Sequence, residues 1–307
     1  MQQEPRSAGS FTAVDYANRG ATYFALGRYE AARADLDEAI RINPNIAKFY
    51  INRGSVYSAL GRHTEALADC NAAIRLDPHL AEAYSNRGNT YSDLGRQSEA
   101  LADFDAAIRI NPKLAAAYFN RGNTYRAMGR HDEALADYDA AIRLDPNLAR
   151  AYANRGNLYR ALGRHREALA DHNTAIRLVP DQALVYTFRG DTYAALGRHA
   201  EAFADYDTAI RLDPNDANAH LNKGVLHAER EEWDDALQAF EAAQRLGHAK
   251  AADYAAKARL MPFERLRPLF RNSHGISSRS RSLILARERL YSSIWEGSCR
   301  TRSSWPS

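Results

Sequence analysis

Residues 81–112 read AEAYSNRGNTYSDLGRQSEALADFDAAIRINP, and related versions of this stretch fill most of the chain. Its tripeptide Asn-Arg-Gly recurs every 34 residues from Asn18-Arg19-Gly20 to Asn154-Arg155-Gly156. Two degenerate copies, Phe188-Arg189-Gly190 and Asn222-Lys223-Gly224, keep the same register. A unit of this length cannot bury its own apolar face, so the strict period predicts stacked units with one continuous core. Such stacks usually bind other molecules and rarely catalyse reactions.

Further rows of residues move with the tripeptide. One tyrosine row lies two residues before it: Tyr16, Tyr50, Tyr84, Tyr118, Tyr152 and Tyr186. A second lies three residues after its Gly: Tyr23, Tyr57, Tyr91, Tyr125, Tyr159 and Tyr193. An Asp follows each Arg of the tripeptide after sixteen residues: Asp35, Asp69, Asp103, Asp137, Asp171 and Asp205. We expect each Arg to form a structural ion pair with this Asp, between two helices.

The second repeat predicts a first helix over residues 47–60. Tyr50, Gly54 and Tyr57 lie three or four residues apart, which places them on one helix face. Gly61 then supplies the left-handed residue that commonly ends a helix. The small Gly54 would let a neighbouring helix approach, with tyrosine rings of an adjacent position beside it.

A second helix is expected over residues 64–76. Thr64 is the predicted N-cap, since its hydroxyl can accept a bond from the first turn. Asp77-Pro78 should end the helix, because proline cannot continue the backbone hydrogen bonds. Cys70 takes the place of an aromatic residue in other repeats and is predicted to lie in the core.

The combined pattern resembles the tetratricopeptide repeat (TPR), a 34-residue helix–turn–helix. The resemblance covers residues 13–250, as seven repeats, and leaves residues 1–12 as an N-terminal extension. It implies an all-α fold, a right-handed superhelical solenoid. Residues 249–261 are expected to form a helix that caps the last repeat, as arrays of this kind need.

The end of the chain differs in composition. Residues 262–307 carry nine Arg and three Glu, so the net charge of +3 comes from this tail and the repeats are slightly acidic. The basic, Ser/Arg-rich tail is predicted to be disordered. An amphipathic helix over residues 283–295, or a tail that is not native coding sequence, are the alternatives. No apolar run of membrane-spanning length or signal-peptide kind is seen, so a cytoplasmic location is expected.

Catalytic patterns do not emerge. One histidine position recurs in four repeats, after the Gly-Arg pair, and is expected in the turn between helices: His63, His131, His165 and His199. One residue per repeat is too widely spaced for a shared metal site. His220 and His227 replace the two tyrosine rows in the seventh repeat and are expected to pack there. We therefore predict no enzyme activity, no cofactor, no metal and no small-molecule substrate.

The candidate binding surface is a double row of asparagines. The first row is the Asn of each Asn-Arg-Gly, and the second, partial row is the residue directly after the Gly: Asn89, Asn123 and Asn157. In the resembling family the first helix of each repeat lines the concave groove, which implies that residues beside Asn-Arg-Gly face it. An Asn amide offers both a donor and an acceptor and thus complements a peptide unit. Arg126, Arg150 and Arg160 would favour acidic side chains. The predicted peptide-binding residues, with both rows complete in repeats three to five, are Asn52, Asn86, Asn89, Asn120, Asn123, Arg126, Arg150, Asn154, Asn157 and Arg160.

Two alternatives stay open at this point. The asparagines can instead hydrogen-bond neighbouring helices and only set the spacing of the repeats. The predicted function is a scaffold that binds an extended peptide segment or a partner protein in the concave groove, with no nucleic-acid or membrane partner. The alternative function is a regulatory or targeting subunit whose basic tail contacts membrane or nucleic acid.

Overall fold

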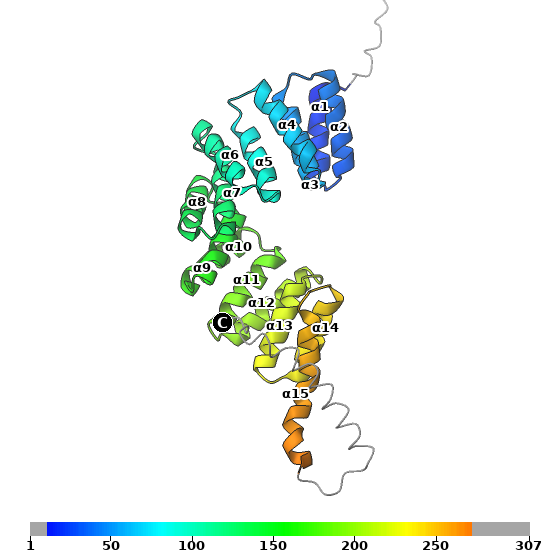
Figure 1. The fold of residues 1–307 in the computed structure, drawn as a ribbon, viewed down its shortest axis with the longest axis vertical. Helices are drawn as coiled ribbons and strands as arrows, with labels where there is room; N and C mark the ends of the chain where they lie inside the picture. Colours follow the sequence, from blue (N-terminus) through cyan, green and yellow to red (C-terminus); the bar gives the residue numbers. More distant parts are fainter. Residues whose placement is uncertain (1–10, 272–307) are drawn as a thin grey trace, which may run out of the picture. The chain divides into compact units, whose positions relative to one another are not determined.

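The computed structural model describes residues 11–271, with side chains to Met261. This part of the chain contains helices joined by short turns and no strands (Figure 1), which confirms the predicted all-α class. It divides into two compact units after Pro180. The first unit holds α1 (Ala13–Ala25), α2 (Tyr29–Ile42), α3 (Ala47–Ala59), α4 (His63–Leu76), α5 (Ala81–Asp93), α6 (Gln97–Ile110), α7 (Ala115–Ala127), α8 (His131–Leu144), α9 (Ala149–Ala161) and α10 (His165–Leu178). The second holds α11 (Ala183–Ala195), α12 (His199–Leu212), α13 (Ala217–Glu229), α14 (Trp233–Arg245) and α15 (Ala251–Arg271).

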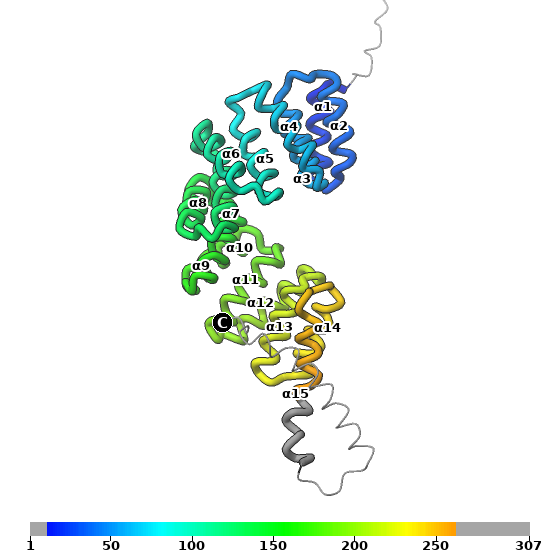
Figure 2. Tube along the Cα trace, viewed as in Figure 1, coloured from blue at the N-terminus to red at the C-terminus, as the bar shows by residue number. Residues whose placement is uncertain are grey.

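Within each unit, helices that follow one another along the chain pack side by side, as the tube in Figure 2 traces. A left-handed glycine separates the two helices of each of the first six pairs, and Gly61 has φ +70° as predicted. The helix after it begins at His63, so the predicted N-cap at Thr64 is wrong. The carbonyl of Arg62 already accepts the bond from the Ala66 amide, at 3.0 Å, which makes Arg62 the N-cap. The recurring histidines are therefore first residues of second helices, not turn residues.

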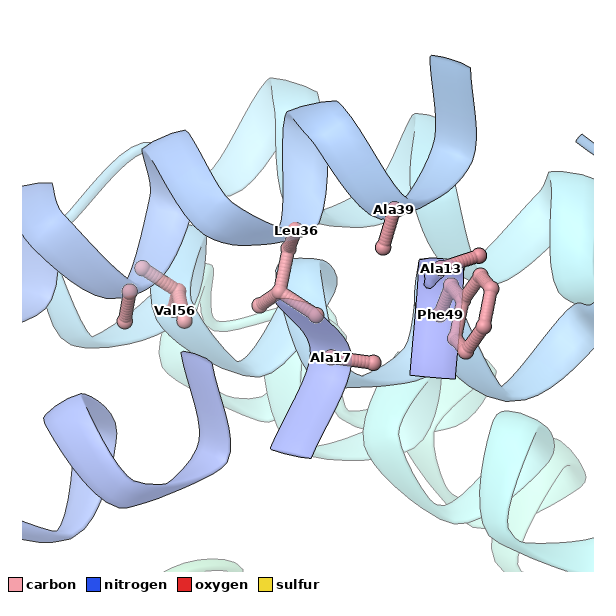
Figure 3. Close-up of a cluster of buried hydrophobic side chains, with 7 residues drawn as sticks. Ala13, Ala17, Leu36, Ala39, Phe49 and Val56 are labelled. Carbon is pink, nitrogen blue, oxygen red and sulfur yellow. The ribbon is translucent and has the colours of Figure 1, made fainter. Parts of the chain in front are cut away.

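The core is shared between successive repeats. Figure 3 shows the first part of it, where Ala13 and Ala17 of α1, Leu36 and Ala39 of α2 and Phe49 and Val56 of α3 meet. The first helix of the second repeat thus completes the core of the first, as the stacking argument requires.

The residue beside each packed glycine is not a tyrosine of the two rows, which corrects our expectation. It lies sixteen residues after the glycine, on the second helix of the same repeat: Leu36, Cys70, Phe104, Tyr138, His172, Tyr206 and Phe240. A Cβ at Gly88 would lie 2.9 Å from the Phe104 ring, so there is no room for a side chain between the backbone of the first helix and this ring on the second helix. Cys70 is buried in this row, and burial raises the pKa of its thiol to about 12.

The predicted Arg–Asp pairs are confirmed in all six repeats that carry them. Each Arg makes two bonds of 2.6–2.8 Å to the Asp sixteen residues later, as Arg121 does to Asp137. In repeats two to five a third bond reaches back to the preceding repeat, for instance from Arg121 to Asp105 at 2.6 Å. The bidentate bond to Asp137 raises the pKa of Arg121. The tyrosine rows flank these guanidinium groups, with Tyr118 and Tyr125 on Arg121.

The last helix covers the seventh repeat. Ala251, Ala255 and Ala258 of α15 pack against Phe240 and Leu221. This helix starts at Ala251 and continues to Arg271, so the expected end at Met261 is corrected. Pro262 and Pro268 both lie within this helix, and each leaves one backbone carbonyl of the helix without its amide donor. The predictions for the rest of the basic tail fall on residues 272–307, outside the described part. Within residues 11–271, no helix is both long and apolar enough to span a membrane.

Candidate functional site

A cavity of about 490 Å³ opens along the first helices of repeats two to four. Every lining residue except one alanine is polar: Ser55, Ser58 and Ala59 from α3, Asn86, Asn89, Ser92 and Asp93 from α5, and Asn120 and Asn123 from α7. Asn86, Asn89 and Ser92 are spaced three residues apart, so each helix presents the same face to the cavity. The 34-residue period then repeats that face on the next helix.

Some asparagines of the first row are bonded to the neighbouring repeat. The Asn86 Nδ2 donates to Ser55 Oγ at 3.0 Å, and the Asn154 Nδ2 donates to Asn123 Oδ1 at 2.8 Å. Both partners lie 31 residues earlier, directly after the Gly of the preceding repeat. We call each pair formed by the residue after the Gly of one repeat and the first-row residue of the next repeat a step. At these two steps the asparagines form hydrogen bonds between neighbouring helices, in agreement with the structural alternative considered above.

Tyrosines on the second helices strengthen two of these connections. The Tyr138 hydroxyl donates to Asn123 Oδ1 at 2.8 Å, on the same oxygen that accepts from Asn154. In the second unit the Tyr206 hydroxyl donates to Asp191 Oδ1 at 2.9 Å, and Asn222 donates to the same oxygen. The hydroxyl thus holds the acceptor in the orientation that the next repeat uses.

The step between Asn89 and Asn120 is different. The residue that corresponds to Tyr138 is Phe104, which has no hydroxyl to orient Asn89. Among the residues that the structure describes, neither the Asn89 nor the Asn120 side chain has a hydrogen-bond partner, and both line the cavity. Two half-buried amides therefore present unused donors and acceptors to the same space.

The three predicted arginines lie on α7 and α9, beyond the lining of the cavity. Arg126 is exposed near Tyr138, where burial raises the pKa of the phenol and the nearby guanidinium partly opposes this. Arg150 is exposed and its guanidinium lies 4.8 Å from the centre of the Phe119 ring. Arg160 donates to Asn157 Oδ1 at 2.9 Å.

The structure therefore brings together four of the ten predicted residues: Asn86, Asn89, Asn120 and Asn123. Asn52, Asn154, Asn157 and the arginines are not among the lining residues, and the cavity lies one repeat earlier than the complete asparagine rows suggest. Sequence reasoning missed Ser55, Ser58, Ser92 and Asp93. A signal for them exists, because they occupy the same helix face as the asparagines, directly or four to five residues after the Gly.

Comparison with known proteins agrees with this architecture. The model of the "TPR repeat" family matches residues 20–61, 54–95, 88–129, 122–163 and 190–230, and that of the "Tetratricopeptide repeat" matches residues 149–182. The chain belongs to the tetratricopeptide repeat family. As a member of it, the chain is a protein-interaction scaffold with protein or peptide partners.

Solved structures show the same fold. A tetratricopeptide repeat protein from Parabacteroides merdae is 23% identical, with 80% of this chain and 98% of that chain covered and a TM-score of 0.59. The APC/C hetero-tetramer Cut9–Hcn1 contains a chain that is 15% identical, with 81% of this chain and 53% of that chain covered and a TM-score of 0.66. A comparison with curated proteins found no match.

Proposed function

We propose that the cavity on α3, α5 and α7 holds the main chain of an extended peptide segment. The observation that carries this proposal is the pair of open amides, Asn89 and Asn120, within a polar cavity of about 490 Å³. That volume falls in the range of small-ligand pockets in general, and an extended segment can enter it from the open side.

The two amides cannot supply the affinity alone. Each net hydrogen bond contributes about 1 kcal/mol, whereas association costs about 4–15 kcal/mol. Further contacts must come from groups beside the cavity. Arg126 and Arg150 are exposed on the adjoining helices of the same unit, and each can pair with a carboxylate of the ligand. The preferred segment therefore carries acidic residues on the side of α7 and α9.

The acidic side chain at the cavity also restricts the ligand. Asp93 is exposed and has no hydrogen bond or ion pair to other described residues. A carboxylate of the peptide placed beside Asp93 would be repelled, so the segment near α5 should be neutral or basic. The resulting ligand has a charge gradient, with its acidic part over α9.

Peptides selected from a random library against the full chain test this proposal. We expect the N89A/N120A variant to bind the selected peptides at least tenfold more weakly, a loss of about 1.4 kcal/mol, without loss of helical circular dichroism. The matched control is N154A/N222A, which likewise replaces two asparagines on first helices of repeats by alanine. Both of these are bonded within the fold and neither lines the cavity.

Two results would contradict the proposal. One is an unchanged peptide affinity of N89A/N120A. The other is an equal loss of affinity in N154A/N222A, which would place the binding surface elsewhere or make the effect one of general stability.

A further inference from the structure

The turn between the two helices holds a fixed trio of side chains in repeats two to six. In the second repeat Arg62 lies 4.7 Å from the centre of the Tyr57 ring and donates to Glu65 at 2.7 Å. The next four repeats repeat this arrangement, with Arg-to-ring distances of 4.3–4.6 Å. The backbone of the turn therefore brings these three positions together whichever residues occupy them.

The seventh repeat replaces all three members of the trio. His227 stands in the tyrosine position, Glu232 in the arginine position and Asp235 in the glutamate position. The turn keeps its geometry, since Glu231 has φ +63° where the other repeats have a glycine at +68° to +73°. One ligand atom from each of His227, Glu232 and Asp235 lies within 4.8 Å of the other two. Nδ1 of His227 is 2.7 Å from Oε2 of Glu232.

Neighbouring side chains hold two of the three groups in place. The ring of Phe203 packs on His227, with 4.5 Å between centroids. Arg230 lies over the same Phe203 ring and binds Oε1 of Glu232 at 3.0 Å. The other oxygen, Oε2, faces the histidine. Such support of a ligand by an outer group is common around metal ions.

The exchange also changes the charge. A second carboxylate replaces the guanidinium at the centre of the trio, and the cation that pairs with it, Arg230, lies outside the trio. Asp235 is exposed and makes no hydrogen bond or ion pair within residues 11–261. Two carboxylates at this distance favour a cation between them.

We propose that His227, Glu232 and Asp235 bind a divalent transition-metal ion with the ligand preference of Zn²⁺. An imidazole with two carboxylates suits such an ion, whereas Mg²⁺ and Ca²⁺ prefer oxygen ligands alone. The metal would replace the direct contact between Nδ1 of His227 and Oε2 of Glu232. With Zn–ligand distances of about 2.0–2.2 Å, tetrahedral ligand atoms lie about 3.3–3.6 Å apart. The His227 and Glu232 ligand atoms, which are 2.7 Å apart, must therefore separate, and the exposed Asp235 must turn inward.

The ion would connect two helices of the last repeat. His227 belongs to α13, whereas Glu232 is the N-cap of α14 and Asp235 lies in its first turn. Binding to the folded form alone stabilises that form by mass action. The expected consequence is a metal-dependent stability of the seventh repeat, independent of the groove on the first unit.

Isothermal titration of the untagged full chain with zinc chloride tests this site. We expect H227Y/E232R, which restores the residues of repeats two to six, to bind zinc at least tenfold more weakly than the wild type. D235N changes an exposed, unbonded group and should weaken binding at least tenfold with the fold intact. H220Y is the matched control, because it replaces the other histidine of a tyrosine row on the same helix. Its zinc affinity should be unchanged.

Thermal denaturation supplies a second readout. Zinc should raise the melting temperature of the wild type and of H220Y, and leave that of D235N and of H227Y/E232R almost unchanged. The proposal is overturned if D235N binds zinc as tightly as the wild type, or if H220Y loses as much affinity as D235N. Equal displacement of zinc by Ca²⁺ or Mg²⁺ would also overturn it, because the site would then be a plain acidic patch. D235N keeps the test valid even if H227Y/E232R does not fold.

Discussion

The step from Asn123 to Asn154 and the step from Asn89 to Asn120 have the same side chains at equivalent positions, one repeat apart. In the first, the amide of Asn154 donates to Asn123, whose oxygen also accepts from Tyr138. In the second, where Phe104 replaces the tyrosine, both amides are open to the cavity. At these two steps the difference in hydrogen bonding coincides with one hydroxyl on the second helix, which Tyr138 has and Phe104 lacks, although Asn86 bonds to Ser55 beside Cys70 without such a hydroxyl.

The largest effect on the unfolding free energy should come from replacing an arginine of the Asn-Arg-Gly row, which lies next to the asparagines of both steps. Arg121 is mostly buried between Tyr118 and Tyr125, and its partner Asp137 is buried. Arg121→Ala leaves that carboxylate uncompensated, so we expect a loss of about 3 kcal/mol or more in unfolding free energy. Urea denaturation followed by circular dichroism measures it.

Arg130→Ala is the matched control for this loss. Arg130 also pairs with a carboxylate, Glu133, and stacks on Tyr125, but both partners of the pair are exposed. Exposed pairs contribute little, so its effect should be a small fraction of that of Arg121→Ala. Equal losses would mean that burial of the Arg–Asp pairs does not decide stability.

The arginine row also shows what the sequence can predict. Its partners follow from the sequence, because a sixteen-residue spacing within one repeat fixes which helix faces meet. The same holds for the helix pairs and for Gly61, whose left-handed conformation the Gly-Arg turn requires. The N-cap was predicted wrongly at Thr64 because the helix already begins at His63, directly after Arg62, which is the N-cap without a side-chain cap bond.

Whether each asparagine side chain is hydrogen-bonded within the fold or open to the cavity could not be predicted in the same way. Whether Asn89 is open depends on Phe104, fifteen residues later, and on an amide 31 residues later in the next repeat. The repeat pattern treats Phe104 and Tyr138 as equivalent aromatic core residues, since both fill the same space in the core, and so it does not show that only one of them has a hydroxyl. The variation in that row is visible in the sequence, but only the packing shows that the Tyr138 hydroxyl reaches Asn123, which lines the cavity.

An effect of intermediate size should distinguish the two steps directly. Asn123→Ala removes the acceptor of both Asn154 and the Tyr138 hydroxyl, so we expect a loss of about 1–3 kcal/mol in unfolding free energy. Asn89→Ala removes no hydrogen bond within the described residues and should leave stability within about 0.5 kcal/mol of the wild type. Denaturation midpoints of the two variants provide the comparison. A similar loss for both would show that Asn89 also connects repeats.

The smallest change in stability is expected when Phe104 is replaced by tyrosine or Tyr138 by phenylalanine. Phe104→Tyr adds the hydroxyl that Asn89 lacks, in a space that already accepts Tyr138 one repeat later. We expect this hydroxyl to orient Asn89 as an acceptor for Asn120, which would close the open step. Stability should rise by less than about 1 kcal/mol, and affinity for the selected peptides should fall severalfold. Tyr138→Phe should have the opposite sign on stability, because it frees Asn123.

The control for this exchange is Phe240→Tyr in the seventh repeat. There the residue after the glycine is Val225, which offers no acceptor, so the added hydroxyl cannot close a step and peptide affinity should stay unchanged. If Phe104→Tyr also leaves the affinity unchanged while raising stability, the step has closed without loss of binding. The amides of Asn89 and Asn120 would then not contact the peptide, and the difference between the two steps would be one of stability alone.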